Sequence, residues 1–151
     1  MECAPVSKLP DGPQWLFEIK LDGYRAVAVK SDRGVDLFSR RKKSFNRQYP
    51  HVVEALAELP DSTDGEVVAL DETGRPNFNL LQNFRSEVSR IHYFIFDLLV
   101  SNDRDLTRLP LSERRKLTTL PKKLAWTGRA GSVLCKRFIL NIVLTFSMSL
   151  L

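Results

Sequence analysis

The sequence predicts an α+β domain in which antiparallel sheets pack against flanking helices. Apolar and polar residues alternate in short runs over 17–40, with turn residues between the runs, which indicates strands. Apolar residues recur at helical spacing over 52–59, and residues 91–100 form an almost continuous apolar run typical of a central buried strand. The length of 151 residues, 43% of them hydrophobic, suits one globular domain or a part of one.

The first forty residues predict an extended lead-in followed by an antiparallel meander. Residues 1–14 contain three prolines and a glycine, which leave no room for a helix. The first strand begins at Trp15, and its alternation from Phe17 places Glu18, Lys20 and Asp22 on one face. The turn signal Asp22-Gly23 and a second break at 32–34 then predict strands over 24–30 and 35–40.

The remainder predicts a mixture of helices and strands. The expected elements are a helix over 52–59 ended by Pro60, a strand over 66–70, a short helix beginning in 78–84, the buried strand 91–100 and a helix that includes 111–117. The run 138–151 is apolar but shorter than a membrane-spanning helix requires. We therefore expect no membrane association.

The net charge and the two cysteines indicate which kinds of partner and site the chain is expected to have. The net charge of +5 favours a polyanionic partner, although many soluble proteins carry as much. Cys3 and Cys135 fit no zinc-ligand spacing and no disulfide framework. Glu2 stands where a signal peptide carries basic residues, so we expect a cytoplasmic protein.

The segment Glu18-Ile19-Lys20-Leu21-Asp22-Gly23-Tyr24-Arg25 carries the candidate chemistry. A lone lysine on a strand is usually a solvated surface charge. The pattern K-x-D-G-x-R, however, arises by chance about once in a thousand chains of this length. A lysine amine is nucleophilic only when deprotonated, which desolvation or a nearby cation such as Arg25 or a bound metal favours.

This segment resembles motif I of the covalent nucleotidyltransferases, a superfamily of ATP-dependent DNA ligases, RNA ligases and capping enzymes. Three further segments resemble later motifs in the same order, although each alone would be an ordinary turn or core strand. They are Ser39-Arg40 for motif Ia, Asp64-Gly65-Glu66 with Val67-Val68 for motif III, and Tyr93 to Leu99 for motif IIIa. The residue patterns over 9–18 and 78–82 are similar to those in the ligase module of the bacterial LigD-type end-joining ligases.

The resemblance implies an ATP-grasp-like nucleotidyltransferase domain, the DNA ligase adenylation fold, with ATP and Mg²⁺ as cofactors. It implies that Lys20 attacks the α-phosphate, forms lysyl-AMP and passes AMP to a 5′-phosphate of DNA with nicks or broken ends. It also implies a role for six further residues: Glu18 and Ile19 at the adenine edge, Arg25 and Arg40 on ribose and phosphates, Glu66 on a ribose hydroxyl or the metal, and Phe96 stacked on adenine, with Phe94 as the second choice.

The resemblance covers about residues 5–120, and motif IV, motif V and an OB-fold domain are not recognisable after it. We therefore divide the chain into the lead-in 1–14, a partial adenylation domain over 15–127, and an atypical apolar tail over 128–151, and describe it as C-terminally truncated. Because the missing motifs supply phosphate and metal ligands, we expect ligation by this chain alone to be weak or absent. Whether an end-joining partner protein cooperates is left open.

Two other functions remain possible from the residues. One is a non-catalytic nucleotide- or DNA-binding remnant that uses the basic run Arg40, Arg41, Lys42, Lys43 and Arg47, which could equally be a solvated loop. The other is an RNA ligase or a capping-type nucleotidyltransferase, which the nucleotide that labels the protein would distinguish.

Overall fold

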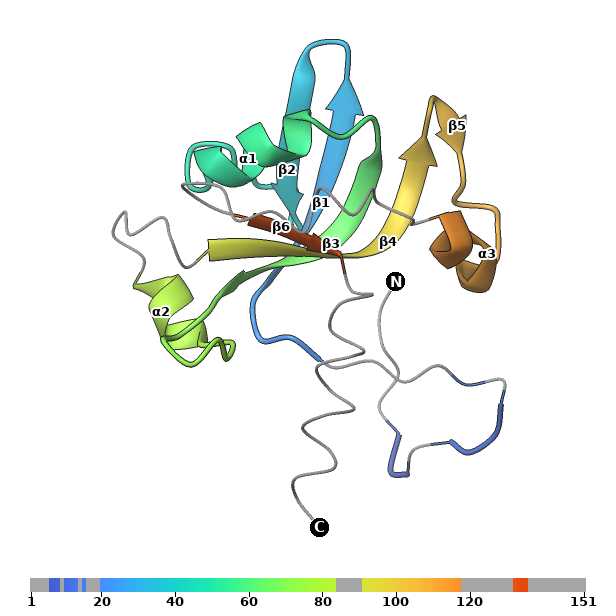
Figure 1. Ribbon diagram of the computed structural model, residues 1–151, viewed down its shortest axis with the longest axis horizontal. Helices are drawn as coiled ribbons and strands as arrows, with labels where there is room; N and C mark the ends of the chain where they lie inside the picture. The colour runs from blue at the N-terminus through green and yellow to red at the C-terminus, as the bar shows by residue number, and fades with distance from the viewer. Residues whose placement is uncertain are drawn as a thin grey trace.

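The chain folds around one six-stranded sheet (Figure 1). The computed structural model describes residues 6–8, 10–13, 15, 20–83, 91–117 and the backbone of 132–135. In chain order, the elements are β1 (Tyr24–Ser31), β2 (Gly34–Ser39), α1 (Pro50–Ala57), β3 (Ser62–Ala69), α2 (Phe78–Gln82), β4 (Ile91–Ser101), β5 (Arg104–Asp105), α3 (Leu111–Leu117) and β6 (Ser132–Cys135).

The strands follow the spatial order β2-β1-β3-β4-β5, and β6 also pairs with β4. Every pairing is antiparallel except that of β4 with β6, which is parallel. The β1–β2 hairpin closes through Asp32 and Arg33, and Gly34 follows with φ of +121°, a conformation that an L side chain rarely adopts. The predicted antiparallel fold is therefore confirmed, with one parallel edge added.

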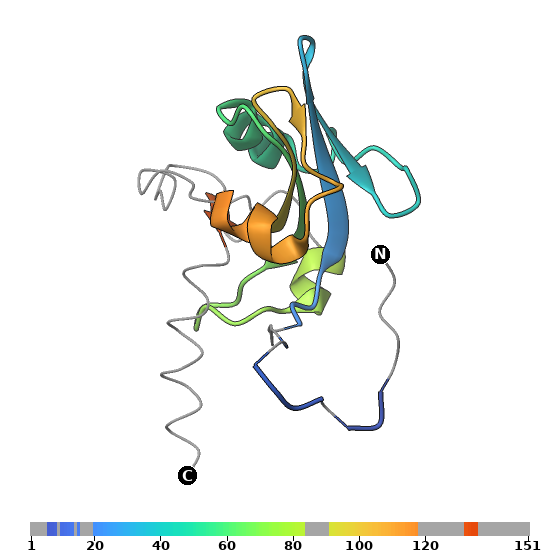
Figure 2. The same cartoon turned by 90° about the vertical axis from the view of Figure 1, so that its right-hand side faces the viewer.

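One face of the sheet carries the core. Ala26 and Ala28 of β1 are buried there together with Leu37 of β2, Val67 of β3 and the ring of Tyr93 of β4. The small side chains of the two alanines leave room in the core, and the buried residues of α1 join the same cluster. Seen after a quarter turn, α1 lies against one side of the β1–β2 hairpin (Figure 2). The alternate residues of each strand consequently point to the opposite face.

The sequence placed most elements correctly and several boundaries wrongly. The strands expected over 24–30, 35–40 and 91–100 and the helices over 52–59, 78–84 and 111–117 all occur within a few residues of their predicted bounds. β3 begins at Ser62 rather than Glu66, because 62–65 pair with β1 on one side and β4 on the other. β5 and β6 were not predicted, and two or four residues carry too little alternation to predict a strand.

The strand expected from Trp15 to Asp22 does not reach Asp22. Lys20, Leu21 and Asp22 lie in no strand, and residues 16–19 are outside the described residues. The physical reason is the close approach at Gly23, where a Cβ would lie 2.2 Å from the carbonyl oxygen of Val67.

The ends of the chain test the remaining expectations only in part. Residues 132–135 pair with β4 although the sequence assigned them to the tail, so the boundary at residue 127 stays a prediction. The apolar run 138–151 lies outside the described residues. Within the described part of the chain, no helix is long and apolar enough to cross a membrane.

Candidate functional site

Several of the functional side chains predicted from the sequence lie on the face of the sheet opposite α1, here called the open face. Strand pairing determines their relative positions: Arg25 on β1 pairs with Glu66 on β3, and Glu66 pairs with Phe94 on β4. Residues opposite one another in an antiparallel pair point to the same side of the sheet. Segments more than 60 residues apart in the sequence thereby contribute to one surface.

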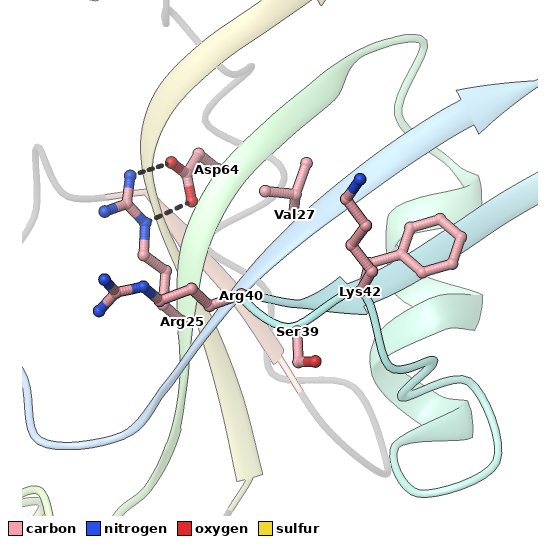
Figure 3. Close-up of a pocket in the computed structure, with 7 residues that line it drawn as sticks. Arg25, Val27, Ser39, Arg40, Lys42 and Asp64 are labelled. Carbon is pink, nitrogen blue, oxygen red and sulfur yellow. Dashed lines mark hydrogen bonds and ion pairs between the residues drawn. The ribbon is translucent and has the colours of Figure 1, made fainter. Parts of the chain in front are cut away.

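Arg25 is the centre of this surface. Its guanidinium group donates two hydrogen bonds to Asp64, from Nε to Oδ1 at 3.2 Å and from Nη2 to Oδ2 at 2.5 Å (Figure 3). The same group lies over the ring of Phe96, with 5.5 Å between Cζ and the ring centroid. Bidentate pairing fixes both the position and the plane of a guanidinium. Arg25 therefore links the motif I strand to the two strands that carry the later motifs.

Glu66 is half-buried beside this pair. The pKa of the Glu66 carboxyl is raised to about 7, chiefly by burial and also by the negative charges of Asp64 and Asp22. The positive charge of Arg25 and the backbone hydrogen bond from Gly23 act in the opposite direction. A carboxyl in this balance can donate or accept a hydrogen bond near neutral pH, and a bound cation would shift it to the ionised form.

A cleft of about 580 Å³ opens beside Arg25, between β1, β3 and the turn after β2 (Figure 3). Val27 and Phe38 supply apolar surface, and the polar lining residues are Arg25, Ser39, Arg40, Lys42 and Asp64. This volume is within the range of small-molecule sites. The combination of apolar surface and three cations suits a ligand that carries both an apolar part and phosphates.

Lys20 lies in the segment before β1, three residues ahead of Gly23. Its side chain is exposed, and Asp22, two residues later, is close enough to Glu66 to affect its titration. The glycine at 23 makes this possible, because a Cβ there would also lie 2.9 Å from Cγ of Glu66. The K-x-D-G-x-R spacing thus brings the segment against β3 next to the motif III glutamate.

The structure brings together three of the predicted site residues, Arg25, Glu66 and Phe96, and places Arg40 in the adjoining cleft with Arg25. Phe94 is buried, with 5% of its surface exposed, whereas Phe96 is only partly buried. This difference favours Phe96 over Phe94 as the stacking residue. Glu18 and Ile19 lie outside the described residues, and the roles of all these residues stay predictions.

Sequence reasoning missed Asp64 and gave Lys42 no individual role. Asp64 was noted only as part of a motif, although strand periodicity places it on the same face as Glu66. Its distance of 39 residues from Arg25 hides the ion pair from any local pattern. Lys42 stood among several basic residues, and only the turn geometry distinguishes it from its neighbours.

The donor set around Glu66 fits a magnesium ion that arrives with a nucleotide. Among the described residues, no group of three or more histidines, cysteines, aspartates or glutamates is arranged to hold a metal ion. Mg²⁺ is usually held by one or two carboxylates, with substrate phosphates and water completing its shell. A half-buried glutamate with a raised pKa meets that requirement, since a cation offsets the cost of its ionisation.

Comparison with known proteins finds similarity to ATP-dependent DNA ligases. A model of the family described as ATP dependent DNA ligase domain matches residues 4–122. The multifunctional non-homologous end joining protein LigD of Pseudomonas aeruginosa is 40% identical over 119 residues, which are 76% of this chain and 14% of that protein. The corresponding Mycobacterium tuberculosis protein is 40% identical over 137 residues, 82% of this chain and 18% of its own length.

Solved structures show the same fold. The ligase domain of M. tuberculosis LigD superposes with a TM-score of 0.58 at 36% identity, over 66% of this chain and 34% of that one. A mycobacterial DNA ligase D complexed with ATP and MES gives a TM-score of 0.59 at 35% identity, with the same two coverages. The chain thus spans less than a fifth of the two curated relatives and about a third of these ligase structures. With the open face, the motif order and these matches taken together, the chain belongs to the ATP-dependent DNA ligase domain family.

Proposed function

We propose that this chain binds ATP on the open face and transfers AMP to Lys20, the first step of ATP-dependent DNA ligation. The observation that carries the proposal is the convergence of Arg25, Glu66 and Phe96 beside the segment that bears Lys20. An aromatic ring, a cation and a carboxyl match the three parts of a nucleotide: base, phosphates and ribose. A related ligase has been solved in complex with ATP, which supports the choice of nucleotide.

The chemistry assigns one role to each of these groups. The amine of Lys20 loses a proton and forms a bond from Nζ to the α-phosphorus, and the bond from that phosphorus to the bridging oxygen breaks, so that pyrophosphate leaves. Arg25 and Arg40 neutralise phosphate charge, Phe96 stacks on the base and Glu66 binds a ribose hydroxyl. Mg²⁺ bound with the nucleotide would screen the leaving pyrophosphate, and Glu66 is the carboxyl best placed to hold it.

We also propose the later steps of ligation, the transfer of AMP to DNA and the sealing of the strand, for the whole protein to which this domain belongs in its relatives. In DNA ligation, AMP passes from the lysine to a 5′-phosphate at a nick or broken end, and the strand is then sealed. Relatives named for non-homologous end joining support DNA ends as the substrate, and cooperation with another end-joining protein is compatible with those names. This chain spans only part of those relatives, and sealing of DNA by it is therefore a proposal.

The test is incubation of the purified chain with α-labelled ATP or GTP and magnesium, followed by a denaturing gel. We expect an acid-labile label from ATP that Lys20→Arg abolishes, since a guanidinium is not nucleophilic at neutral pH. Lys116→Arg, an exposed substitution of the same kind on α3, serves as the matched control and should label normally. A folded chain that takes no label from ATP would refute the catalytic proposal, and labelling by GTP would indicate a capping-type enzyme.

A second candidate function is non-catalytic binding of nucleic acid. The observation in its favour is that Arg40 and Lys42 both line the cleft beside the ion pair of Arg25. Binding of DNA that weakens with salt, without any covalent AMP, would support this function over the enzymatic one.

A further inference from the structure

We infer that Tyr93 is a positioning residue of the open face, because its hydroxyl group fixes, from the core side, the strand backbones that carry Arg25 and Asp64. The inference rests on the proposed function, since the role of Arg25 in nucleotide binding belongs to that proposal. Tyr93 lies in β4 with 0% of its surface exposed and belongs to the core cluster, so a ligand on the open face cannot reach it. Its effect on the site therefore passes through the strands.

The hydroxyl of Tyr93 reaches across β3 to β1. It donates to the carbonyl oxygen of Ala26 at 2.9 Å and to that of Thr63 at 3.3 Å, so the two acceptors share one proton. Burial raises the pKa of the Tyr93 hydroxyl above its ordinary value, and the group consequently keeps this proton at neutral pH. One side chain of β4 thereby connects the other two strands that form the open face.

The contacts of the hydroxyl follow the same diagonal as the ion pair. Arg25 directly precedes Ala26 in β1, and Asp64 directly follows Thr63 in β3. The strand register makes Ala26 and Thr63 diagonal neighbours, and it relates Arg25 to Asp64 in the same way. Successive residues of a strand point to opposite faces. The ion pair therefore crosses the ladder on the open face, and the Tyr93 hydroxyl crosses it at the same place from the core face.

Gly65 provides the space that the ring of Tyr93 occupies. A Cβ on this glycine would lie 2.6 Å from Cζ of Tyr93 and 2.6 Å from the carbonyl oxygen of Phe94. A side chain at this position would therefore displace either the ring or the neighbouring strand. The glycine between Asp64 and Glu66 thus lets the ring pack directly behind the backbone that carries these two carboxyl groups.

The tie lies where the pairing of β3 with β4 is irregular. The register of the two strands shifts between Ser62 and Thr63, and it shifts again between Asp64 and Gly65. Such irregularities interrupt the regular ladder of hydrogen bonds. The backbone of Asp64 lies between the two interruptions, and the Tyr93 hydroxyl supplies a bond from β4 to this short stretch.

The test is hydrogen exchange of arginine Nε protons, followed by NMR in the nucleotide-free chain, with Tyr93→Phe as the variant. This substitution keeps the ring and removes only the hydroxyl. We expect the Nε proton of Arg25, which is bonded to Asp64, to exchange severalfold faster in the variant. The Nε proton of Arg114, which is bonded to Asp97, should keep its wild-type rate and serves as an internal reference in the same molecule.

A second measurement connects the hydroxyl to the proposed activity. In the labelling experiment, Tyr93→Phe should raise severalfold the ATP concentration that gives half-maximal labelling. Tyr49→Phe is the matched control, because it removes the hydroxyl of another fully buried tyrosine, which accepts a hydrogen bond from Gln48 at the start of α1. This control should change neither the exchange rate at Arg25 nor the ATP requirement.

The outcomes separate a positioning role from a purely structural one. Faster exchange at Arg25 alone, with a higher ATP requirement, would support the inference. Equal acceleration at Arg25 and Arg114, or loss of both signals through unfolding, would overturn it, because the hydroxyl would then serve only the fold. Unchanged exchange at Arg25, or an unchanged ATP requirement in a chain that takes label, would overturn it as well. A change at Arg25 alone in a chain that takes no label would support the positioning of Arg25 and refute the proposed adenylation.

Discussion

At the scale of single residues, Arg25 determines how the open face is organised. Through two hydrogen bonds to Asp64 and its position over the ring of Phe96, this β1 residue contacts side chains of both β3 and β4. Asp64 is buried, with 7% of its surface exposed, and the two hydrogen bonds from Arg25 compensate the carboxyl group for its lost contact with water. The arginine of the K-x-D-G-x-R pattern therefore serves both the fold and the proposed nucleotide site.

Glu66 gives a prediction about pH. Its pKa of about 7 in the folded chain lies above the unfolded value of 4.5, so the folded state binds the additional proton. The associated stability is fully present below pH 4.5 and is lost as the pH rises through 7. After allowance for solvent screening, we expect a loss of about 1–2 kcal/mol between pH 5 and pH 8.

Urea unfolding of the wild type and of Glu66→Gln at both pH values measures this effect. The variant should show a smaller loss, while Glu58→Gln, an exposed glutamate at the end of α1, should behave as the wild type does. Burial lowers the pKa values of His51 and His92, which are present in all of these proteins, so the comparison is made between variants. Identical pH profiles for the wild type and Glu66→Gln would contradict the prediction.

At the scale of elements, α3 is fastened to β4 by a buried ion pair. Arg114 donates to Asp97 from Nε at 2.7 Å and from Nη2 at 2.6 Å, and it also donates to the carbonyl oxygen of Leu109. Asp97 directly follows Phe96 in β4, at an irregularity in the pairing with β3. The ion pair therefore holds the part of β4 next to the predicted stacking residue Phe96.

Removal of one partner should be costly. We expect Arg114→Ala to lower the free energy of unfolding by about 3 kcal/mol, because it leaves the Asp97 carboxylate buried without its partner. Lys116→Ala breaks an exposed pair with Glu113 on the same helix and should cost less than about 1 kcal/mol. Chemical denaturation of both variants tests this, and equal losses would show that the Asp97 pair is no more important than a surface pair.

At the scale of the whole molecule, one face of the sheet forms the core and the other face carries the candidate site. The side toward α1 is apolar and supplies the core, whereas the open face carries the ion pair, the half-buried glutamate and the cleft. One layer of strands thereby both stabilises the fold and positions the site. A ligand on the open face would bind across β1, β3 and β4 together, so its binding should stabilise the entire chain.

Thermal unfolding with and without ATP measures this coupling. A ligand that binds only the folded state at a hundred times its Kd adds about 2.7 kcal/mol. We expect ATP to raise Tm more than GTP does, and we expect Phe96→Leu to reduce the shift. Leu80→Ala, at an exposed position on α2, is the control that should keep the full shift. The same shift in Phe96→Leu would exclude stacking on this ring.

The sequence by itself was sufficient for the fold class, the family and the order of most elements. Alternation revealed β1 and β2, helical spacing revealed α1, and the apolar run 91–100 revealed β4. Motif spacing identified Lys20, Arg25, Glu66 and the strand that carries Phe96, because these residues follow one another in a fixed local pattern. These properties are local, so they can be recognised without knowledge of the fold.

Only the tertiary structure decided the features that depend on distant partners. Strand alternation does not say which face is the core, and it is the alanines of β1, not Val27 and Val29, that belong to the buried cluster. The extension of β3 over 62–65 requires partners on both sides, and the end of the expected first strand requires the close approach at Gly23. The ion pairs of Arg25 and Arg114 join residues that are far apart in the sequence, and no local pattern encodes them.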